Sequence, residues 1–513
     1  MAAALIQMEL KGNSIRELED KTFIHNLVQM LSSSSRACIS AGLKLIKKLV
    51  AFPRMVKRLL ADPATVPPLL GLISIVKTDP CWNQEAAAIL ALLVEGSQFT
   101  EHQMYQGLQE LQSQHNINLF LQLIASSDPQ TKVQLLHLLV VLGNKFEMAR
   151  NLIRTDNEAI SYLFSSLEGD QLEVKLWAMK LVYCISEGHP AGVPLPPSPA
   201  KETAIKTLAN ILSNSPNIEE RSTAAGIISQ LPNDDIIIDE ILCKSEVLKA
   251  IHGVICNLDE ESDGTRAPDN SDASLLENAL AALLRYTEPT KPQLYRQVGK
   301  LELYPLLVRI LSRGSSLAKQ RTATALAHLS RSTSLSISDS TITRQQAFPL
   351  LNVMKFFSGM SCCSSEMAEC VNLCRVHGAA CSSRDTFCLV KVDALKPLVQ
   401  NLSEKESGVA EAALMALETL LTDHSTLPHA TAAIVDSQGV VAILQVLEKG
   451  DLPAKIRALD LFQKILEHTR MNGPLAERAE RILVQLLQDD DLRKKVALVL
   501  KQMGILPEQS SYF

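Results

Sequence analysis

Aromatic residues are scarce in this sequence. They make up 4% of its 513 residues and include two Trp, whereas hydrophobic residues as a whole make up 46%. A chain with this much hydrophobic content is not disordered. Its interior must be filled by Leu, Ile, Val and Ala, which is typical of stacked helical repeats.

Several other absences limit the function. The net charge of −6 lacks the basic surplus of a dedicated nucleic-acid binder. The N-terminus shows no charged n-region followed by a continuous apolar h-region, so we expect no signal peptide. The densest apolar run, Val133 to Leu142, is shorter than the roughly 18 residues of a membrane span. We therefore expect a cytoplasmic protein whose eleven cysteines are mostly reduced.

Motifs for catalysis and cofactor binding are also missing. The chain has no GxxxxGK or GxGxxG phosphate loop, and no GxSxG, HExxH or kinase signature. We therefore nominate no catalytic residue, see no catalytic domain, and expect no cofactor and no small-molecule ligand.

A helical repeat is present instead, and it is clearest from Val392 to Asp423. A short apolar helix is followed there by a polar break and by a longer helix with apolar residues at spacings of three and four. Such a pair of helices cannot bury its apolar stripe alone and needs copies of itself on both sides. Copies begin near Lys21, Val66, Asn116, Asn157, Lys201, Val247, Leu301, Val392, Gly439 and Ala476.

Most steps between these copies are about 40–50 residues, the period of armadillo and HEAT repeats. We predict an all-α fold, a right-handed armadillo-repeat superhelix (α-solenoid) of about ten repeats. The predicted domains are N-terminal repeats over residues 1–345 with loop insertions near 188–200 and 259–272, an altered Cys-rich connector over 346–391, and C-terminal repeats over 392–513.

Two segments within this pattern carry alternative interpretations. Residues Ser330 to Thr343 are rich in hydroxyl groups, and we favour a solvated linker over a phosphorylated regulatory loop. Six of the eleven cysteines lie between Ser358 and Cys388. There Cys374, His377 and Cys381 would supply three zinc ligands with Cys370 as the fourth, but no CxxC pair is present. We favour buried reduced thiols and predict no metal.

A concave groove is the expected working surface of such a stack. In armadillo proteins that bind extended peptides, a Trp and an Asn four residues later recur on the helix that lines the groove. The aligned pairs here are Lys44/Lys48, His137/Val141, Lys180/Cys184, Gly226/Gln230, Thr324/His328, Met415/Thr419 and Asp460/Lys464. None is Trp/Asn, and the lysines would repel a basic peptide, so we do not expect an importin-like grip.

We nominate six groove residues for binding a protein partner. They are Lys44, Lys48, Lys180, His328, Met415 and Lys464. An acidic or mixed partner would suit the lysines. The alternative is that these lysines are simply solvated.

Four segments resemble plant U-box/armadillo ubiquitin ligases, and the senescence-associated type most closely. They are CRVHGAACSSRDTFCLVKVDALKPLV (Cys374 to Val399), STAAGIISQLPNDD (Ser222 to Asp235), TATALAHLSRSTSL (Thr322 to Leu335) and GVAEAALMALETLL (Gly408 to Leu421). The elements Cys374-x-x-His377 and Phe387-Cys388-Leu389 lie just before a repeat, as in that family. The resemblance covers essentially the whole chain and argues against zinc, since the family is not known to carry metal there.

The resemblance implies a fold and a role. Family members carry an N-terminal U-box that docks the ubiquitin-conjugating enzyme, whereas their armadillo portion selects substrates and, in the most similar members, associates with the plasma membrane. We find no Cys-Pro pair and no U-box-like segment before Lys21, so ligase activity is not carried over and the chain is expected to start inside the repeats. The expected function is a protein-binding scaffold for substrate or partner recognition in ubiquitination, with peripheral plasma-membrane association. The alternative is a non-catalytic membrane- or vesicle-associated structural adaptor.

Overall fold

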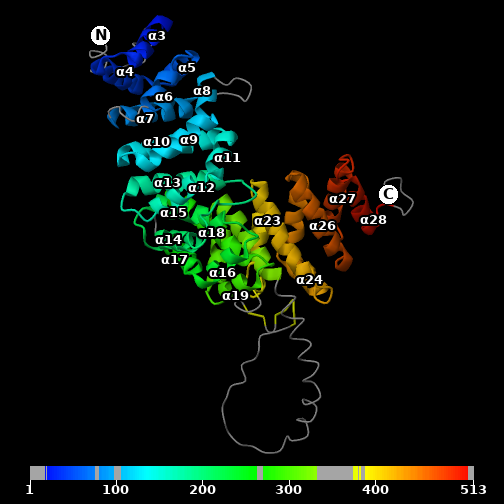
Figure 1. The fold of residues 1–513 in the computed structure, drawn as a ribbon. Helices are drawn as coiled ribbons and strands as arrows, with labels where there is room; N and C mark the ends of the chain where they lie inside the picture. The colour runs from blue at the N-terminus through cyan, green and yellow to red at the C-terminus, as the bar shows by residue number, and fades with distance from the viewer. Residues whose placement is uncertain are drawn as a thin grey trace, which may run out of the picture. The chain divides into compact units, whose positions relative to one another are not determined.

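The fold consists of helices. The computed structural model describes residues 18, 20–74, 80–97, 106–262, 270–331, 374–378, 381–382 and 387–506. Every regular element within these ranges is a helix, and no strand occurs in them. The helices are labelled in Figure 1. They divide into two compact units, Met1–Ile238 and Asp239–Phe513. Each unit is a row of stacked helical repeats, so the predicted all-α solenoid is confirmed, whereas its armadillo class, handedness and number of repeats stay predictions.

The N-terminal unit stacks its helices in chain order. The last helices of successive repeats pack directly on one another: α4 on α7, α7 on α10, α10 on α13 and α13 on α15. We call these five helices the last-helix row of the N-terminal unit. The helices of the unit are α3 (Lys21–Gln29), η1 (Met30–Ser32), α4 (Arg36–Leu49), α5 (Pro53–Ala61), α6 (Val66–Ser74), α7 (Pro80–Gly96), α8 (Gln106–Leu111), α9 (Gln114–Ser126), α10 (Pro129–Lys145), α11 (Glu147–Thr155), α12 (Asn157–Ser166), α13 (Leu172–Ser186), α14 (Ala200–Asn214) and α15 (Ile218–Ser229).

Helix α10 shows why the residues of this row form buried helices. The Asp128 side chain caps its N-terminus by accepting hydrogen bonds from the backbone N–H groups of Gln130 and Thr131. Ten of its 17 residues are buried, more than a single apolar stripe would bury, because α7 and α13 cover two of its sides. Small residues allow this close stacking: a Cβ atom on Gly226 of α15 would lie 2.7 Å from the ring of Tyr183 on α13.

The C-terminal unit repeats the arrangement. Its last-helix row is α18, the helix over residues 316–331, α23, α26 and α28; within it, α26 packs on both α23 and α28. The helix α16 (Ile236–Lys244) begins just before the boundary of the unit. The other elements are α17 (Val247–Ser262), α18 (Asn270–Thr287), α19 (Pro292–Gly299), α20 (Leu303–Arg313), α22 (Leu395–Asn401), α23 (Ser407–Glu418), η3 (Thr419–Leu421), α24 (Leu427–Asp436), α25 (Gly439–Lys449), α26 (Leu452–His468), α27 (Pro474–Leu486) and α28 (Arg493–Gln502).

The repeats begin where the apolar spacing predicts them. The ten predicted start points match the starts of α3, α6, α9, α12, α14, α17, α20, α22, α25 and α27 within a few residues. The structure adds short helices that the two-helix pattern does not include. In α5, for example, only Met55, Val56, Leu59 and Leu60 are buried, a stripe too short to stand out as a separate period in the sequence.

The predicted departures from the repeat lie partly outside the described residues. Residues 188–199 carry no helix. Helix α17 continues to Ser262 and α18 starts at Asn270, so residues 263–269 of the insertion predicted near 259–272 are not described. Most of the hydroxyl-rich segment and all cysteines between residues 358 and 373 are outside the described ranges as well. The predicted domain boundaries near 345 and 391 therefore stay predictions.

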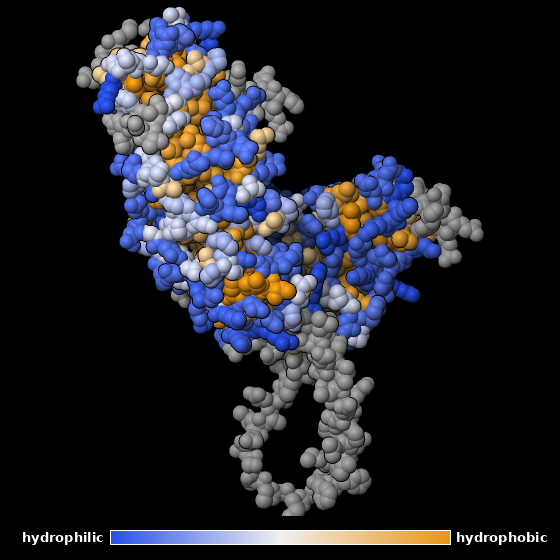
Figure 2. All heavy atoms as spheres, in the orientation of Figure 1, coloured by the Kyte–Doolittle hydropathy of each residue, from blue (hydrophilic) through white to orange (hydrophobic). Residues whose placement is uncertain are grey.

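The exposed large apolar side chains of the described residues are spread over several helices. On the face drawn in Figure 2, hydrophilic side chains dominate and apolar areas are separate from one another. The large apolar residues that the described ranges leave exposed are spread over seven helices, with two neighbours on α16: Met148, Leu172, Ile236, Ile237, Leu317, Leu452, Val484 and Leu498. Among the described helices, none alone is long and apolar enough to cross a bilayer; α24 and α25, bent by 77° at their junction, meet the test only as a pair, by length and composition.

Candidate protein-binding faces

The six nominated residues all lie on the last-helix rows. In the N-terminal unit, Lys44 and Lys48 lie on α4 and Lys180 on α13; Lys44 is exposed and the other two are half-buried. In the C-terminal unit, His328 lies on the helix over residues 316–331, Met415 on α23 and Lys464 on α26, and all three are half-buried. The structure therefore places the nominated residues on the elements expected to line a groove, and their binding role stays a prediction.

A chain of side-chain contacts crosses three joints of the N-terminal row. We call Glu95, His137, Trp177, Lys180 and Glu219 the N-terminal polar ladder. His137 Nε2 on α10 lies 2.9 Å from Glu95 Oε1 on α7, and the His137 ring lies 4.3 Å from the Trp177 ring on α13, centroid to centroid. The Lys180 ammonium lies 4.4 Å from the centre of the same Trp177 ring and 2.7 Å from Glu219 Oε1 on α15.

This ladder changes the interpretation of Lys180. Its ammonium group is shared between an aromatic face and a carboxylate of the same chain, so its charge is largely compensated before any partner arrives. The Glu219 side chain is 56% exposed, and ion pairs at such sites typically contribute only about 0–1 kcal/mol to stability. The ladder therefore sets the shape and the local charge of the face more than it stabilises the fold.

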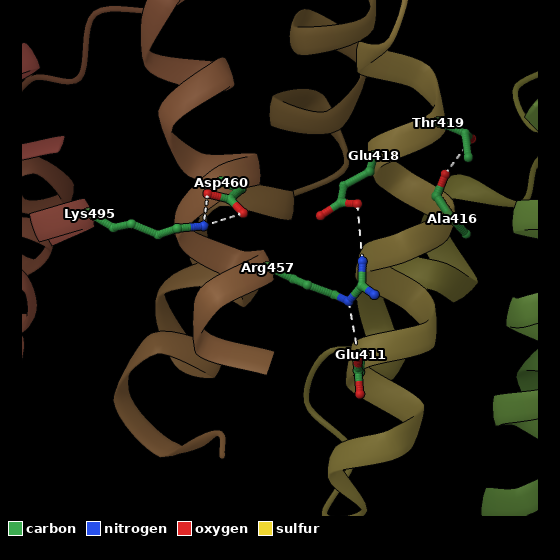
Figure 3. A network of polar contacts seen from close by, with 7 residues as sticks. All are labelled: Glu411, Ala416, Glu418, Thr419, Arg457, Asp460 and Lys495. Carbon is green, nitrogen blue, oxygen red and sulfur yellow. Dashed lines mark hydrogen bonds and ion pairs between the residues drawn. The ribbon is translucent and has the colours of Figure 1, made fainter. Parts of the chain in front are cut away.

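A second polar ladder lies in the C-terminal unit (Figure 3). We call Glu411, Glu418, Arg457, Asp460 and Lys495 the C-terminal polar ladder. Arg457 on α26 reaches two carboxylates on α23: its Nε is 3.0 Å from Glu411 Oε1 and its Nη1 is 3.5 Å from Glu418 Oε2. Lys495 on α28 contacts both oxygens of Asp460 on α26, at 2.6 and 2.7 Å. Ion pairs thus join α23, α26 and α28, which are successive helices of the C-terminal last-helix row.

Two nominated positions lie beside this second ladder. Met415 lies between Glu411 and Glu418 on α23, at a helical spacing from both. The charge of Lys464 acts on Glu418: burial raises the pKa of this carboxyl group above its ordinary value, while Arg457 and Lys464 act to lower it. The face thus combines the apolar thioether of Met415, the partly buried carboxyl group of Glu418 and the ion pairs of the ladder. Such a face suits a partner that carries apolar, acidic and basic side chains.

His328 is half-buried against the end of a neighbouring helix. Its Nδ1 lies 3.4 Å from the hydroxyl oxygen of Thr287 at the end of α18. Burial lowers the pKa of His328 below its ordinary value, and the nearby Arg331 acts in the same direction. Ser330, which lies two residues after His328 on the same helix, is buried and forms a hydrogen bond with the buried Thr419 of η3. His328 is therefore part of the joint between helices, which leaves less of it to face a partner.

Sequence reasoning missed the residues that organise both faces. Trp177, Arg457, Glu411 and Glu418 were not nominated because the alignment to peptide-binding armadillo repeats inspects only two positions per helix. The sequence does contain a signal for two of these residues: Glu411 and Glu418 are seven residues apart on one predicted helix and therefore share a face. Their partner Arg457 cannot be identified without the register of α26 on α23.

One group of side chains could hold a metal ion, among the residues that the structure describes. Cys374, His377, Cys381 and Cys388 place one ligand atom each within 4.8 Å of one another. The sequence interpretation had named Cys370 as the fourth member, but Cys370 lies outside the described ranges and Cys388 takes that place. No other such group of His, Cys, Asp and Glu side chains occurs within the described ranges.

Comparison with known proteins gives a consistent set of plant relatives. The chain is 25% identical to U-box domain-containing protein 43 and 26% identical to U-box domain-containing protein 44, both of Arabidopsis thaliana; the alignments cover 98% and 100% of the chain and 62% and 63% of those proteins. It is 24% identical to U-box domain-containing protein 24 of Oryza sativa subsp. japonica over 95% of the chain and 61% of the relative. The chain thus spans about three fifths of the length of these relatives.

Other comparisons concern the fold. No protein-family model matches the chain. The crystal structure of an engineered protein superimposes with a TM-score of 0.62 at 16% identity, covering 94% of this chain and 98% of the engineered one. At this identity the likeness concerns the helical fold alone.

Proposed function

Because this chain is related to plant U-box domain-containing proteins, we propose that its helical repeats bind protein partners or substrates in a ubiquitination pathway. The relationship over nearly the whole chain carries the proposal. U-box domains are the part of ubiquitin ligases that docks the conjugating enzyme, so repeats that accompany them are suited to choosing what is modified. The proposed role of this chain is recognition.

The two polar ladders support recognition of a protein surface. Each lies along a last-helix row, where successive helices present repeated side chains at a regular step, and such rows form extended binding surfaces in helical solenoids. The charges on each ladder are paired and of mixed sign. A paired, mixed surface matches a partner that carries both acidic and basic groups better than a uniformly charged ligand.

The test compares two lysines of the same repeat. Lys464 lies on α26 beside the C-terminal polar ladder, whereas Lys449 lies exposed at the end of α25. The chain and the variants Lys464→Glu and Lys449→Glu would be expressed in plant cells, captured, and analysed by quantitative mass spectrometry. Ubiquitin-remnant profiling would be run on the same cells with and without the chain.

The expected result links capture to modification. A set of proteins should lose capture several-fold with Lys464→Glu but not with Lys449→Glu, and the ubiquitination of these proteins should change when the chain is present. Circular dichroism and thermal unfolding of both variants would establish that the helical fold is retained. If capture depends on Lys464 while the ubiquitination of the captured proteins is unaffected by the chain, the ubiquitination role is wrong and a structural adaptor takes its place.

A further inference from the structure

The cysteine segment before α22 holds a compact group of donor atoms. Cys374, Cys381 and Cys388 are 6%, 7% and 0% exposed, and their sulfur atoms surround one ring nitrogen of His377. The distance from His377 Nδ1 is 3.4 Å to each of the three sulfur atoms. The sulfur atoms of Cys374 and Cys388 are 3.8 Å apart, and all four donor atoms lie within 4.8 Å of one another.

The three distances of 3.4 Å and the one of 3.8 Å are close to the edges of a tetrahedron around a zinc ion. Zinc bonds to sulfur at about 2.3 Å and to imidazole nitrogen at about 2.0–2.1 Å, so tetrahedral angles place two sulfur ligands about 3.8 Å apart and a sulfur and a nitrogen about 3.6 Å apart. A disulfide would require its two sulfur atoms at about 2.05 Å. The observed spacing fits metal ligation and does not fit a covalent bond between Cys374 and Cys388.

Hydrogen bonding alone does not account for the arrangement. A ring nitrogen of histidine carries either one N–H group or one lone pair, so it forms one good hydrogen bond. Three sulfur atoms at the same distance from His377 Nδ1 therefore leave at least two of them without that partner. A cation at the centre of the four atoms would satisfy all of them at once.

The surrounding contacts hold the four ligands in place. Gly378 follows the histidine with a φ of 60°, a left-handed conformation that glycine adopts readily, and its N–H donates to the carbonyl oxygen of Cys374 at 2.8 Å. Phe387 precedes the last ligand, is 3% exposed, and accepts a hydrogen bond at its carbonyl oxygen from the hydroxyl group of Tyr304 on α20. The ligands are thus anchored to a helix as well as to one another.

We propose that Cys374, His377, Cys381 and Cys388 form a structural zinc site. Four protein ligands close the coordination sphere and leave no position for water or substrate, which is the arrangement of structural rather than catalytic zinc. The ion would fasten the described residues before α22 (374–378, 381–382 and 387–394), none of which belongs to a helix. The sequence alone favours buried reduced thiols because no CxxC pair is present. Cys388, 14 residues from Cys374 along the chain, joins the group only in the folded protein.

The first experiment measures metal in the intact chain. Protein purified without chelators and with any affinity tag removed should contain about one equivalent of zinc by mass spectrometric metal analysis. Metal-stripped protein titrated anaerobically with Co²⁺ should develop the visible bands of a tetrahedral site together with a near-ultraviolet thiolate-to-cobalt charge-transfer band. Addition of Zn²⁺ should remove these bands.

Variants then assign the ligands. Cys388→Ser and Cys374→Ser should each lose most of the bound zinc and weaken the charge-transfer band. Cys184→Ser is the matched control, since Cys184 is also buried, at 4% exposure, but lies on α13 and belongs to no such group among the described residues. It should retain the full zinc content.

Clear outcomes would overturn the proposal. The proposal is wrong if wild-type protein contains no zinc as purified and gives no charge-transfer band with Co²⁺. This result needs no variant, so poor folding of the serine variants cannot obscure it. Zinc retained at full stoichiometry by the Cys374→Ser/Cys388→Ser double variant would place the ion elsewhere. Thiol counts showing a Cys374–Cys388 disulfide in protein prepared under reducing conditions would also exclude the site.

Discussion

Two non-helical connectors in the described part of the chain are held in different ways. The Pro-rich connector (residues 188–199) lies between α13 and α14. The Val193 N–H donates to the carbonyl oxygen of Gln230 at 2.8 Å, and the guanidinium group of Arg154 on α11 donates to the carbonyl oxygens of Ile185 and Gly192. Neighbouring helices thus fasten this connector through its backbone.

The cysteine connector (described residues 374–378, 381–382 and 387–394) relies on side chains. Phe387 lies against Tyr304 and Tyr295, with ring centroids 5.8 and 6.4 Å away. Phe387 also has a φ of 49°, which costs about 1–2 kcal/mol for a residue other than glycine and persists because its ring and carbonyl group are both held. The grouped ligands Cys374 and Cys388 add a second set of side-chain contacts.

The two connectors should therefore be sensitive to different substitutions. Prolines restrict φ in the first connector, so much of its conformation is set before packing and its weak points are backbone positions without room for a side chain. The second connector depends on a buried aromatic ring. Large-to-small substitution should therefore damage the cysteine connector, whereas small-to-large substitution should damage the Pro-rich connector.

The largest effect is expected for Phe387→Ala. Removing a buried phenylalanine ring typically costs about 3–5 kcal/mol because the surrounding structure relaxes only partly into the cavity. The φ of 49° stays unfavourable for alanine, which no longer has a ring to hold it. Urea unfolding of the full chain, with hydrogen exchange to locate the change, should show faster exchange in α19, α20 and α22. The conservative variant Phe387→Leu should lose less. Equal losses for both variants would mean that the ring is not what holds the connector.

A somewhat smaller effect is expected for Gly192→Ala in the Pro-rich connector. Gly192 has a φ of 65°, and a Cβ atom there would lie 2.3 Å from the carbonyl oxygen of Gln230. A strained backbone together with overpacking should cost about 2–4 kcal/mol.

The matched control is Gly188→Ala in the same connector. Gly188 has a φ of 70° but nothing within 4 Å of a Cβ atom, so only the backbone cost of about 1–2 kcal/mol should appear. The difference in unfolding free energy between the two variants measures the steric contact with Gln230. If the two variants were equally destabilised, the connector would not be packed on the end of α15 as described.

The next effect in size concerns Arg154→Met. The substitution keeps most of the apolar volume of the side chain but removes the guanidinium donors to Ile185 and Gly192. Hydrogen bonds from charged groups typically contribute about 1.5–3 kcal/mol, and we expect a loss in this range by urea unfolding. Arg154→Lys keeps the charge but lacks the planar fork of donors, so it should recover only part of the loss. Full recovery by lysine would show that charge, and not the two carbonyl contacts, is what matters.

The sequence predicts the helices of the repeats better than the contacts between them. The start of α12 at Asn157 and of α25 at Gly439 follow from local apolar spacing, which each segment carries by itself. The pairing of Arg457 with Glu411 depends instead on the register of one helix on another. The approach of Cys388 to Cys374 depends on the path of a loop. Both are tertiary properties, and no local periodicity encodes them.

The smallest effect is expected for His328, on the helix over residues 316–331. Burial lowers the pKa of His328 in the folded protein below the ordinary value of about 6.5 that it has when unfolded. Between these two values the unfolded chain binds more protons than the folded chain, so stability rises with pH across this window and falls as the pH drops below about 6.5. Arg331 strengthens this trend and Glu288 opposes it.

The variant His328→Gln removes the proton-binding group but keeps a polar side chain near Thr287. We therefore expect wild type to lose more stability than His328→Gln when urea unfolding is repeated at steps from pH 7.5 to pH 5. Above pH 7.5 the two curves should run parallel, because His328 is neutral in both the folded and the unfolded states. If wild type instead gained stability relative to the variant on acidification, folding would favour the charged imidazole. Water would then reach the joint between α18 and residues 316–331 more than its burial indicates.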